Sequence, residues 1–358
     1  MVPESVRREN VLLAPHTTMG LGGPARYFAV CRTTAALCEH LAWARKKGLP
    51  VQILGGGSNT LFADQGFDGL VLKIELRGLA FAAQGEWVAV RAGAGEDWDD
   101  LVQLCVERGL GGIECLSGIP GLVGATPIQN VGAYGQEVRE TLVRIAALDR
   151  QNFAAVEFAP EECDFNYRQS RFKGADKDRY IITQVSYRLR REGRAQLQYP
   201  ELRRYVEECI EVEKLEQGRP VLSAVRAAVL QLRRRKSMVI DPADPNARSL
   251  GSFFLNPILS EGAFRTLERC WEKMGGRGSI PAFAVPEGIK IAAAWLVEQA
   301  GFAKGYSRGG AAISSRHALA LINCGGSTRE VLDLAGEIQQ GVKARFDIWL
   351  EREPVVVC

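Results

Sequence analysis

The sequence contains few histidines and none of the short cysteine motifs that commonly hold metal ions. Its three histidines are His16, His40 and His317, and its nine cysteines are scattered along the chain without one CxxC pair. Zinc sites draw their ligands from closely spaced cysteines and histidines, so no metal site is expected. The odd number of cysteines argues against a disulfide scaffold, and we interpret them as reduced thiols that pack as small core residues.

Long hydrophobic runs are also missing. No segment approaches the roughly 20 consecutive apolar residues that a membrane span needs, and residues 1–15 lack the pattern of a signal peptide. We therefore expect a cytoplasmic protein without a membrane span. The net charge of +3 is too small to indicate nucleic acid as a partner, but it is compatible with one basic pocket for an anionic ligand.

The composition is that of a globular protein: 46% of the 358 residues are hydrophobic and 24% are charged. This length predicts two or three domains, and no repeat or low-complexity linker marks their boundaries. Apolar residues at helical spacing, together with end signals such as Gly48 and Gly109, predict helices. The predicted helices are 35–47, 97–108, 289–300 and 328–346, with a charged helical stretch at 202–236. The predicted strands are 51–54, 69–74, 87–92, 154–158, 180–188 and 355–357.

The strand at 51–54 runs directly into a glycine loop, GGGSN at 55–59. Glycines allow successive backbone N–H groups to converge on one point, which suits a pyrophosphate. The loop matches neither the GxGxxG fingerprint nor the P-loop, so a Rossmann or kinase-like interpretation is poor. Taken alone, it is either a tight turn or a cofactor loop.

A second loop, GIPGLVGATPIQNVGAYG at 118–135, has five glycines and two prolines among mostly apolar residues. Solvent-exposed loops are usually polar. An apolar, glycine-rich loop must pack against something, and a flat aromatic cofactor is one candidate. The alternative is a buried Ω-loop with a purely structural role.

Five segments in order resemble the UDP-N-acetylenolpyruvoylglucosamine reductase (MurB) family. They are GGGSN, LSGIPGLVGATPIQNVGAYG, NYRQSRFK, GSFFLNP and WLEREP, and they extend the match from about residue 17 to 354. The resemblance implies an α+β fold, with a two-lobed FAD-binding domain of the vanillyl-alcohol oxidase (PCMH) type and a C-terminal α+β substrate-binding domain. The expected boundaries are 1–75 for lobe 1, joined by a strand within 347–358, then 76–220 for lobe 2 and 221–346 for the C-terminal domain.

The resemblance also implies a two-step hydride transfer. NADPH reduces a non-covalently bound FAD and leaves, and the enolpyruvyl ether of UDP-N-acetylglucosamine then receives hydride at its β-carbon. A proton at the α-carbon completes UDP-N-acetylmuramic acid, a peptidoglycan precursor. Both partners are small molecules, and the chain is expected to act as a monomer.

By the same resemblance, the FAD contacts lie in the two glycine loops. The expected cofactor-binding residues are Gly55, Gly56, Gly57, Ser58, Asn59, Ser117, Ile119, Pro120, Gly124, Ala125, Gln129, Gly132, Ala133 and Tyr134.

Three catalytic residues are implied by the family motifs. Arg168 would hold the substrate carboxylate, because a guanidinium can grip two oxygens at once. Ser252 would donate the proton, and Glu353 would orient or stabilise the enolic intermediate. Each has a structural alternative: a surface arginine, a turn serine and an exposed terminal carboxylate. Glu351 is a rival for Glu353, because two residues apart in a strand share one face.

The implied substrate-binding residues are Tyr167, Tyr199, Lys236, Asn256 and His317. Lys236 would reach the UDP pyrophosphate, although a run of four basic residues is commonly a solvated helix end, and the other three are expected to do little. Tyr199 resembles a tyrosine on the lid segment of type I-like members. His317 has an equally good structural interpretation.

Two alternatives from the residues stay open. An FAD-dependent alcohol oxidase would share the first half of the chain and often tethers its flavin through His or Cys, and Cys115 borders the second glycine loop. A flavoprotein that binds a UDP-sugar without turnover is the other alternative, against which the joint presence of Arg168, Ser252 and Glu353 argues.

Overall fold

The structure is a computed structural model, and it describes residues 6–194, 197–209 and 218–358, without the side chain of Cys209. The chain forms two compact units. Unit 1 comprises Met1–Leu12, Pro24–Gly57 and Phe67–Ile240, and unit 2 comprises Leu13–Gly23, Ser58–Gly66 and Asp241–Cys358. Both contain helices and strands, so the α+β prediction is confirmed.

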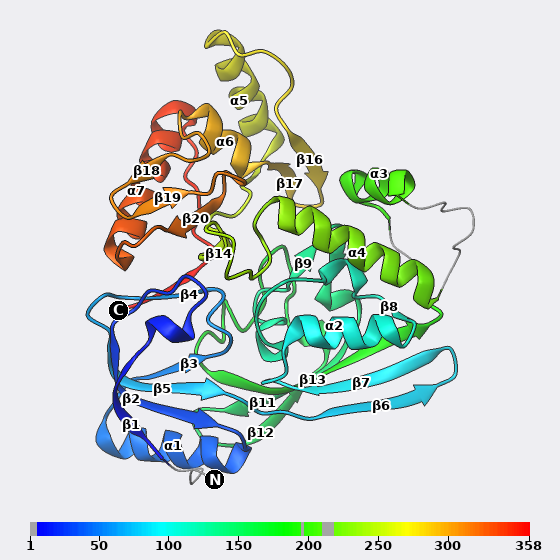
Figure 1. Cartoon of the computed structure of the whole chain (residues 1–358), viewed down its shortest axis with the longest axis vertical. Coiled ribbons are helices and arrows are strands. Elements are labelled where there is room, and N and C mark those ends of the chain that lie inside the picture. The colour runs from blue at the N-terminus through cyan, green and yellow to red at the C-terminus, as the bar shows by residue number, and fades with distance from the viewer. Residues whose placement is uncertain (1–5, 195–196, 210–217) are drawn as a thin grey trace. The chain divides into compact units, whose positions relative to one another are not determined.

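Unit 1 begins with a four-stranded sheet in the order β1-β2-β5-β3. Its strands are β1 (Arg8–Leu12), β2 (Pro24–Cys31), β3 (Val51–Leu54) and β5 (Phe67–Ile74). β5 is parallel to both β2 and β3, while β1 is antiparallel to β2. Helix α1 (Thr34–Lys47) lies along one face of this sheet (Figure 1).

The ends of α1 follow the signals in the sequence. The Thr33 side chain caps the first turn by accepting from the Ala36 N–H, and Gly48 ends the helix in the left-handed conformation with φ +64°. An N-cap of this kind contributes about 1 kcal/mol to helix stability. The helix buries Leu37, Leu41 and Ala44, which fixes the face it turns toward the sheet.

The second sheet of unit 1 is antiparallel, with the order β12-β11-β13-β7-β6 and β8 beside β13. Its strands are β6 (Leu79–Gln84), β7 (Trp87–Gly93), β8 (Leu110–Gly111), β11 (Leu142–Asp149), β12 (Ala155–Phe158) and β13 (Tyr180–Arg191). Helix α2 (Trp98–Glu107) lies over this sheet, α4 (Arg219–Arg235) packs against α2, and α3 (Pro200–Cys209) packs on α4 (Figure 1).

Both sheets of unit 1 share one hydrophobic core. It joins side chains from α1 and the first sheet, such as Leu37 and Leu72, to side chains from α2 and the second sheet, such as Val102 and Ile145. Between these elements the second glycine loop folds into short turns and a small ribbon, β9 (Gly132–Ala133) with β10 (Gln136–Glu137). Side chains of this core therefore pack against the second glycine loop and support it.

Unit 2 contains three small sheets and three helices. The strand orders are β14-β20-β19-β18, β15-β17-β16 and β21-β4. The strands are β4 (Thr60–Phe62), β14 (Ser249–Ser252), β15 (Ile258–Leu259), β16 (Ala282–Val285), β17 (Gly288–Ile291), β18 (Ser307–Arg308), β19 (Ala311–Ile313), β20 (Ala320–Asn323) and β21 (Val355–Val357). The helices are α5 (Glu261–Lys273), α6 (Ala293–Gln299) and α7 (Thr328–Phe346), and α7 starts with a capping box between Ser327 and Glu330.

The prediction of one helix over 289–300 is wrong in its first part. Ile289 and Ile291 flank Lys290 with the period of a strand, and β17 pairs with both β15 and β16 before α6 begins at Ala293. In the predicted helical stretch 202–236, the structure has α3 and α4, and residues 210–217 lie outside the described part.

The contact division also differs from the predicted domain ranges. It assigns α4 to unit 1, where the helix packs on α2, and it assigns Ser58–Gly66 to unit 2, because β4 pairs in parallel with β21. The ranges 1–75, 76–220 and 221–346 stay a prediction.

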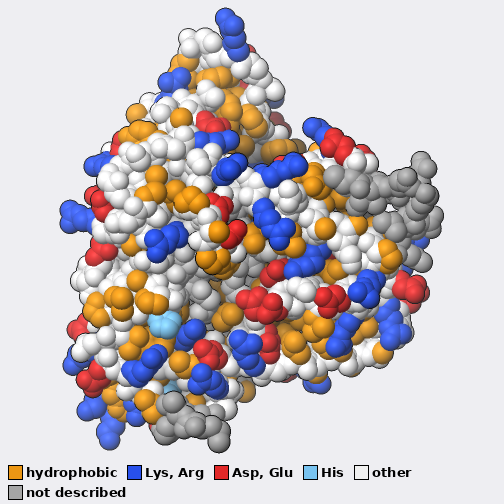
Figure 2. All heavy atoms as spheres, viewed as in Figure 1, with side chains coloured by type: hydrophobic (Ala, Val, Ile, Leu, Met, Phe, Trp, Pro, Cys, Tyr) orange, Lys and Arg blue, Asp and Glu red, His pale blue; other side chains and the backbone are white. Residues whose placement is uncertain are grey.

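Over unit 1, Figure 2 shows basic and acidic side chains interspersed, in keeping with the small net charge. No helix among the described residues is long and apolar enough to cross a membrane.

Candidate functional site

The two glycine loops of the sequence meet in unit 1. An added Cβ on Gly56 would lie 3.0 Å from the Cα of Gly121, and one on Gly55 would lie 3.8 Å from a methyl of Leu122. The loops thus approach each other backbone to backbone, which only residues without a Cβ allow at Gly56. Gly57 and Gly121 also adopt positive φ angles, +65° and +128°. At this contact the glycine backbones lie close together, and the Leu122 side chain packs beside them.

The second loop is held by backbone hydrogen bonds to the segment that enters α2. Gly124 N–H donates to the Ala94 carbonyl at 3.0 Å, and Val123 N–H donates to the Glu96 carbonyl at 2.9 Å. An added Cβ on Gly124 would lie 2.6 Å from the Cβ of Ala94. Close strand-to-loop packing therefore accounts for the glycine at 124.

A buried carboxyl that the sequence analysis did not single out closes the same loop. Glu114 is 0% exposed; its carboxylate accepts from Gly112 N–H at 2.7 Å and from the Gln136 side-chain amide at 2.7 Å. Gln136 in turn accepts from Cys115 N–H at 2.8 Å. The start and the end of the loop are thus joined. No sequence motif pointed to this pair, because its partners are 22 residues apart.

These observations fit a flavin nucleotide. Two glycine-rich loops whose backbones lie close together can present N–H groups to a pyrophosphate, and the surrounding core fixes their shape. Of the predicted cofactor residues in or next to the second loop, Ser117, Gly124 and Gly132 are buried, and Ala125 is exposed. The half-buried ones are Ile119, Pro120, Gln129, Ala133 and Tyr134.

The first glycine loop divides between the two units after Gly57. In unit 2, Asn59 holds the C-terminal segment: its side-chain amide donates to the Glu353 carbonyl at 3.4 Å, and its own carbonyl accepts from Val355 N–H at 2.9 Å. The Asn59 side chain thereby holds the backbone of Glu353, a predicted catalytic residue.

Arg168 of unit 1 reaches the second glycine loop. Its guanidinium donates to the Gly132 carbonyl at 2.5 Å and to the Asn130 carbonyl at 3.5 Å, and its own φ is +53°. A left-handed arginine is uncommon outside functional sites and tight turns. Its Cζ lies 5.3 Å from the ring centre of Tyr167, another predicted site residue. The Arg168 side chain thus lies against the second glycine loop and does not extend into solvent.

Ser252 and Glu353 lie on adjoining segments of unit 2. Phe253, the residue after Ser252, is paired with Glu353, whose N–H donates to the Phe253 carbonyl at 2.9 Å. Both Ser252 and Glu353 are half-buried, whereas Glu351 is exposed. A half-buried carboxyl has the more shielded environment of the two, so burial favours Glu353 over its rival. An added Cβ on Gly251 would meet nothing within 4 Å in the described part of the chain.

Lys236, Tyr134 and Tyr199 come together in unit 1. The rings of Tyr134 and Tyr199 lie edge to face, 5.4 Å apart, and the Lys236 ammonium lies 5.9 Å from the Tyr134 ring centre. Lys236 forms an ion pair of 2.8 Å with Glu201 of α3. Burial, with a smaller contribution from nearby charges such as Glu201, raises the pKa of Tyr134 to about 12, so its hydroxyl stays protonated at neutral pH.

The expectation that the neighbours of Lys236 do little is wrong for Arg233. Its Nε donates to the Gly118 carbonyl at 3.2 Å and its Nη2 donates to the Met238 carbonyl at 2.7 Å. Burial lowers the pKa of the Arg233 guanidinium, as expected for a cation removed from water. Arg233 therefore holds the second glycine loop.

The other two predicted substrate residues lie in unit 2. The Asn256 side-chain oxygen accepts from Ala293 N–H at 2.9 Å, which satisfies the first turn of α6. His317 is half-buried, and its carbonyl accepts from Ala320 N–H at 3.1 Å. Asn256 thus has a structural role through one of its two polar atoms.

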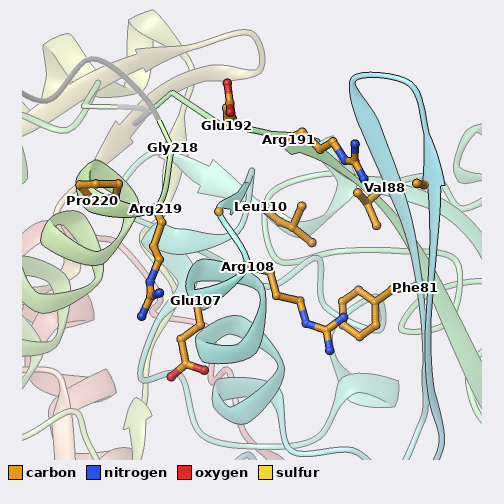
Figure 3. Close-up of a pocket in the computed structure, with 12 residues that line it drawn as sticks. Phe81, Val88, Glu107, Arg108, Leu110, Arg191, Glu192, Gly218, Arg219 and Pro220 are labelled. Atoms are coloured by element: carbon orange, nitrogen blue, oxygen red, sulfur yellow. The ribbon is translucent and has the colours of Figure 1, made fainter.

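A cavity of about 870 Å³ in unit 1 lies apart from these residues. Figure 3 shows it between β6, β7, the end of α2 and the start of α4, with the Arg108 guanidinium stacked on Phe81, 3.9 Å from the ring centre. None of the predicted site residues lines it.

Cys115, the potential tether of a covalent flavin, is fully buried, and burial raises the pKa of its thiol. A thiol that stays protonated is a poor nucleophile. This environment does not favour the covalent attachment seen in many oxidases.

Comparisons with known proteins agree over the whole chain. The profile described as "UDP-N-acetylenolpyruvoylglucosamine reductase, C-terminal domain" matches residues 242–357, and the profile "FAD binding domain" matches residues 25–151. The UDP-N-acetylenolpyruvoylglucosamine reductase of Thermobifida fusca is 46% identical, over 97% of this chain and 97% of the relative. That of Streptomyces coelicolor is 44% identical, over 96% and 88%.

A solved structure is similar too. The crystal structure of UDP-N-acetylenolpyruvylglucosamine reductase (MurB) from Thermus caldophilus has a TM-score of 0.65 and 25% identity, and the match covers 99% of this chain and 98% of that one.

Proposed function

The chain belongs to the UDP-N-acetylenolpyruvoylglucosamine reductase family, and from that premise we propose that it reduces the enolpyruvyl ether of UDP-N-acetylglucosamine to UDP-N-acetylmuramic acid in peptidoglycan synthesis. The observation that carries the proposal is the identity of 46% extending over 97% of the chain. The two glycine loops that meet in unit 1 also support it, because glycine-rich backbone of this kind suits a nucleotide cofactor.

FAD, when bound in the two glycine loops, would supply the hydride chemistry that connects NADPH with the β-carbon of the substrate. Reduction at that carbon would place negative charge on the α-carbon and its carboxylate. Arg168 would hold that carboxylate, since its planar fork can face two oxygens, and Gly132 and Asn130 fix its direction. Stabilising charge where it develops is the largest contribution most enzymes make.

Ser252 Oγ would supply the proton to the α-carbon. A hydroxyl is a poor acid, so it must be held close to a strongly basic carbon, and the strand pairing of β14 with β20 fixes its backbone. Glu353, on the paired segment, would orient or stabilise the enolic intermediate. Lys236 would approach the pyrophosphate, with Tyr167, Tyr199, Asn256 and His317 as further substrate contacts.

The alternative functions differ from the reductase in the electron donor and acceptor. An alcohol oxidase would pass them from an alcohol to oxygen, and a binding protein would not pass them at all. We propose the reductase, acting as a cytoplasmic monomer.

The test is an anaerobic two-step experiment with the FAD-loaded protein. Addition of NADPH should bleach the visible absorption of the flavin, and addition of the enolpyruvyl substrate should restore it with formation of UDP-N-acetylmuramic acid. Bleaching that persists after the substrate is added would refute the proposed reaction. A flavin that stays attached after acid precipitation would point to the oxidase. Sedimentation equilibrium checks the monomer.

A further inference from the structure

The backbone of Gly118, at the start of the second glycine loop, is held by charged side chains at both of its peptide groups. Its N–H donates to Asp99 Oδ1 at 2.6 Å, and its carbonyl accepts from Arg233 Nε at 3.2 Å. Gly118 itself has a φ of +70°, and an added Cβ would lie 2.7 Å from a methyl of Leu230. The orientations of the peptide groups before and after Gly118 are therefore each fixed by one hydrogen bond, and the Leu230 contact favours glycine between them.

Asp99 is in turn held by Arg226. The guanidinium donates to both carboxylate oxygens, at 2.5 and 2.9 Å, and to the side chain of Gln103 at 3.3 Å. This bidentate geometry is the strongest form of such a pair. The side chain of Arg226 is only 11% exposed, so water competes little with the contact.

Arg226 and Arg233 are seven residues apart on α4, so two helical turns place them on one face. The same helix buries Val225, Val229 and Leu232 against Cys115 and the half-buried Tyr134 of the glycine-loop region. Helix α4 thus contacts this region directly through Arg233 and an apolar stripe. Arg226 acts on it through Asp99 of α2, whose carboxylate accepts from both Arg226 and Gly118. Figure 1 shows α2 and α4 adjacent.

We propose that Asp99, Arg226 and Arg233 are positioning residues, which set the affinity and the environment of the flavin by fixing the backbone of Gly118. Gly118 stands between Ser117 and Ile119, two residues expected to contact FAD. A rotation of either peptide group of Gly118 would move a neighbouring residue and change the shape of the loop that binds the flavin. This inference rests on the proposed function, in that it takes the second loop as the flavin loop.

The test compares Arg226→Met and Arg233→Met with Arg234→Met. Arg234 is an exposed arginine of the same helix, so the control removes the same charge without touching Gly118. FAD dissociation constants are measured by titrating the apoprotein and following flavin fluorescence. We expect a loss of affinity of roughly 10-fold or more for the first two variants, the equivalent of one charge-assisted hydrogen bond, and less than about 2-fold for the control. The visible absorption of bound FAD should also shift in the first two variants only.

Thermal unfolding of the apoproteins separates positioning from stability. If Arg226→Met lowers the apoprotein Tm while FAD affinity and spectrum stay those of the wild type, the network serves the fold alone and the proposal is wrong. If Arg226→Met does not fold, the same measurements are made on Asp99→Asn. This variant keeps a side-chain oxygen that can accept from Gly118 N–H, but it removes the charge that pairs with Arg226. Wild-type affinity and spectrum in that variant also overturn the proposal. Failure of the wild type itself to bind FAD would instead refute the proposed function.

Discussion

At the scale of single residues, Ser252 combines a weakly acidic hydroxyl with a well-defined backbone. It ends β14 opposite Ala320 and follows Gly251, whose φ is +74°. The φ of Gly251 is one that other residues adopt only with strain. The proton-donor role proposed for Ser252 therefore rests on placement, not on an unusual acidity.

Ser252→Ala should separate the two steps of the reaction. NADPH should reduce the bound flavin at the wild-type rate, because the hydroxyl takes no part in that step. Reoxidation by the enolpyruvyl substrate should slow by roughly 10²–10⁴-fold, the usual contribution of a positioned proton donor. Stopped-flow absorbance measures both steps, and equal reoxidation rates in mutant and wild type would remove Ser252 from this role.

Arg168→Lys should lower kcat/KM for the enolpyruvyl substrate by roughly 10- to 100-fold, the equivalent of one lost charge-assisted hydrogen bond. An ammonium cannot donate to the loop carbonyls and also face two carboxylate oxygens as the guanidinium does. Steady-state kinetics at saturating NADPH give the value. Arg144→Lys, at an exposed ion pair with Glu157, serves as the control and should leave turnover unchanged. Wild-type kinetics in the Arg168 variant would contradict the assignment.

At the scale of elements, the contact between the glycine loops can be tested without any ligand. Gly56→Ala would place a methyl 3.0 Å from the Gly121 Cα, whereas Gly55→Ala would place one at an ordinary 3.8 Å from Leu122. We expect Gly56→Ala to lower the free energy of unfolding of the apoprotein by about 1–3 kcal/mol, as overpacking does, and Gly55→Ala to change it little. Urea unfolding followed by circular dichroism measures both. Equal stabilities would show that the loops do not meet this closely.

The pairing of α2 with α4 predicts a pH dependence. Burial alone would raise the pKa of Asp99, but its hydrogen bonds from Arg226 and Gly118 and the charges of Arg226 and Arg233 outweigh it and lower the pKa. A carboxyl with a lowered folded pKa stabilises the protein above its unfolded pKa of about 4, and this contribution is lost as the pH falls through the folded pKa.

Asp99→Asn should therefore cost about 1–3 kcal/mol at neutral pH. The difference from wild type should shrink as the pH falls below about 4, because Asp99 is then protonated in the unfolded chain, and it should be lost once the pH passes below the lowered pKa of the folded protein. Denaturant unfolding at a series of pH values gives the difference directly. A difference in the free energy of unfolding that stays constant across that pH range would show that the charge of Asp99 does not stabilise the folded protein.

Sequence patterns predicted the helices that bury one clear stripe, such as α1 and α7, and the strands with continuous apolar runs, such as β3 and β5. They missed β1, β2, β6 and β11 of unit 1, and also most of the short strands of unit 2. The missed strands of unit 2 have only two to four residues, which carry too little periodicity. Helix α6 was predicted too long because the apolar residues from Ile289 onward were assigned to one helical run, although Ile289 and Ile291 have the two-residue spacing of a strand, which pairs with β16.

The site was predictable where the residues form contiguous motifs. Gly118 belongs to a glycine-rich motif that the sequence shows. The residues that contact it, Asp99 and Arg233, lie 19 or more positions away in sequence, and so does Arg226, which contacts Asp99. A charged residue on a helix gives no sign of its partner until the helices are packed. For the same reason Glu114 and Gln136 were not singled out.

At the scale of the whole molecule, cofactor binding should appear as added stability. A ligand at 100 times its dissociation constant that binds only the folded state contributes about 2.7 kcal/mol. Differential scanning calorimetry of the apoprotein with increasing FAD should show a Tm that rises with FAD concentration. NADPH alone, without FAD, should raise it much less. A Tm independent of FAD would contradict flavin binding by this chain.

Unit 2 is assembled from three stretches of chain, and its strand β4 pairs with β21. During synthesis, β21 leaves the ribosome about 300 residues after β4. At 5–20 residues per second, this corresponds to a delay of ~15–60 s. Leu61 and Phe62, fully buried in the finished protein, have no partner strand during that interval. The nascent chain therefore presents a short apolar segment to chaperones and proteases until its last strand arrives.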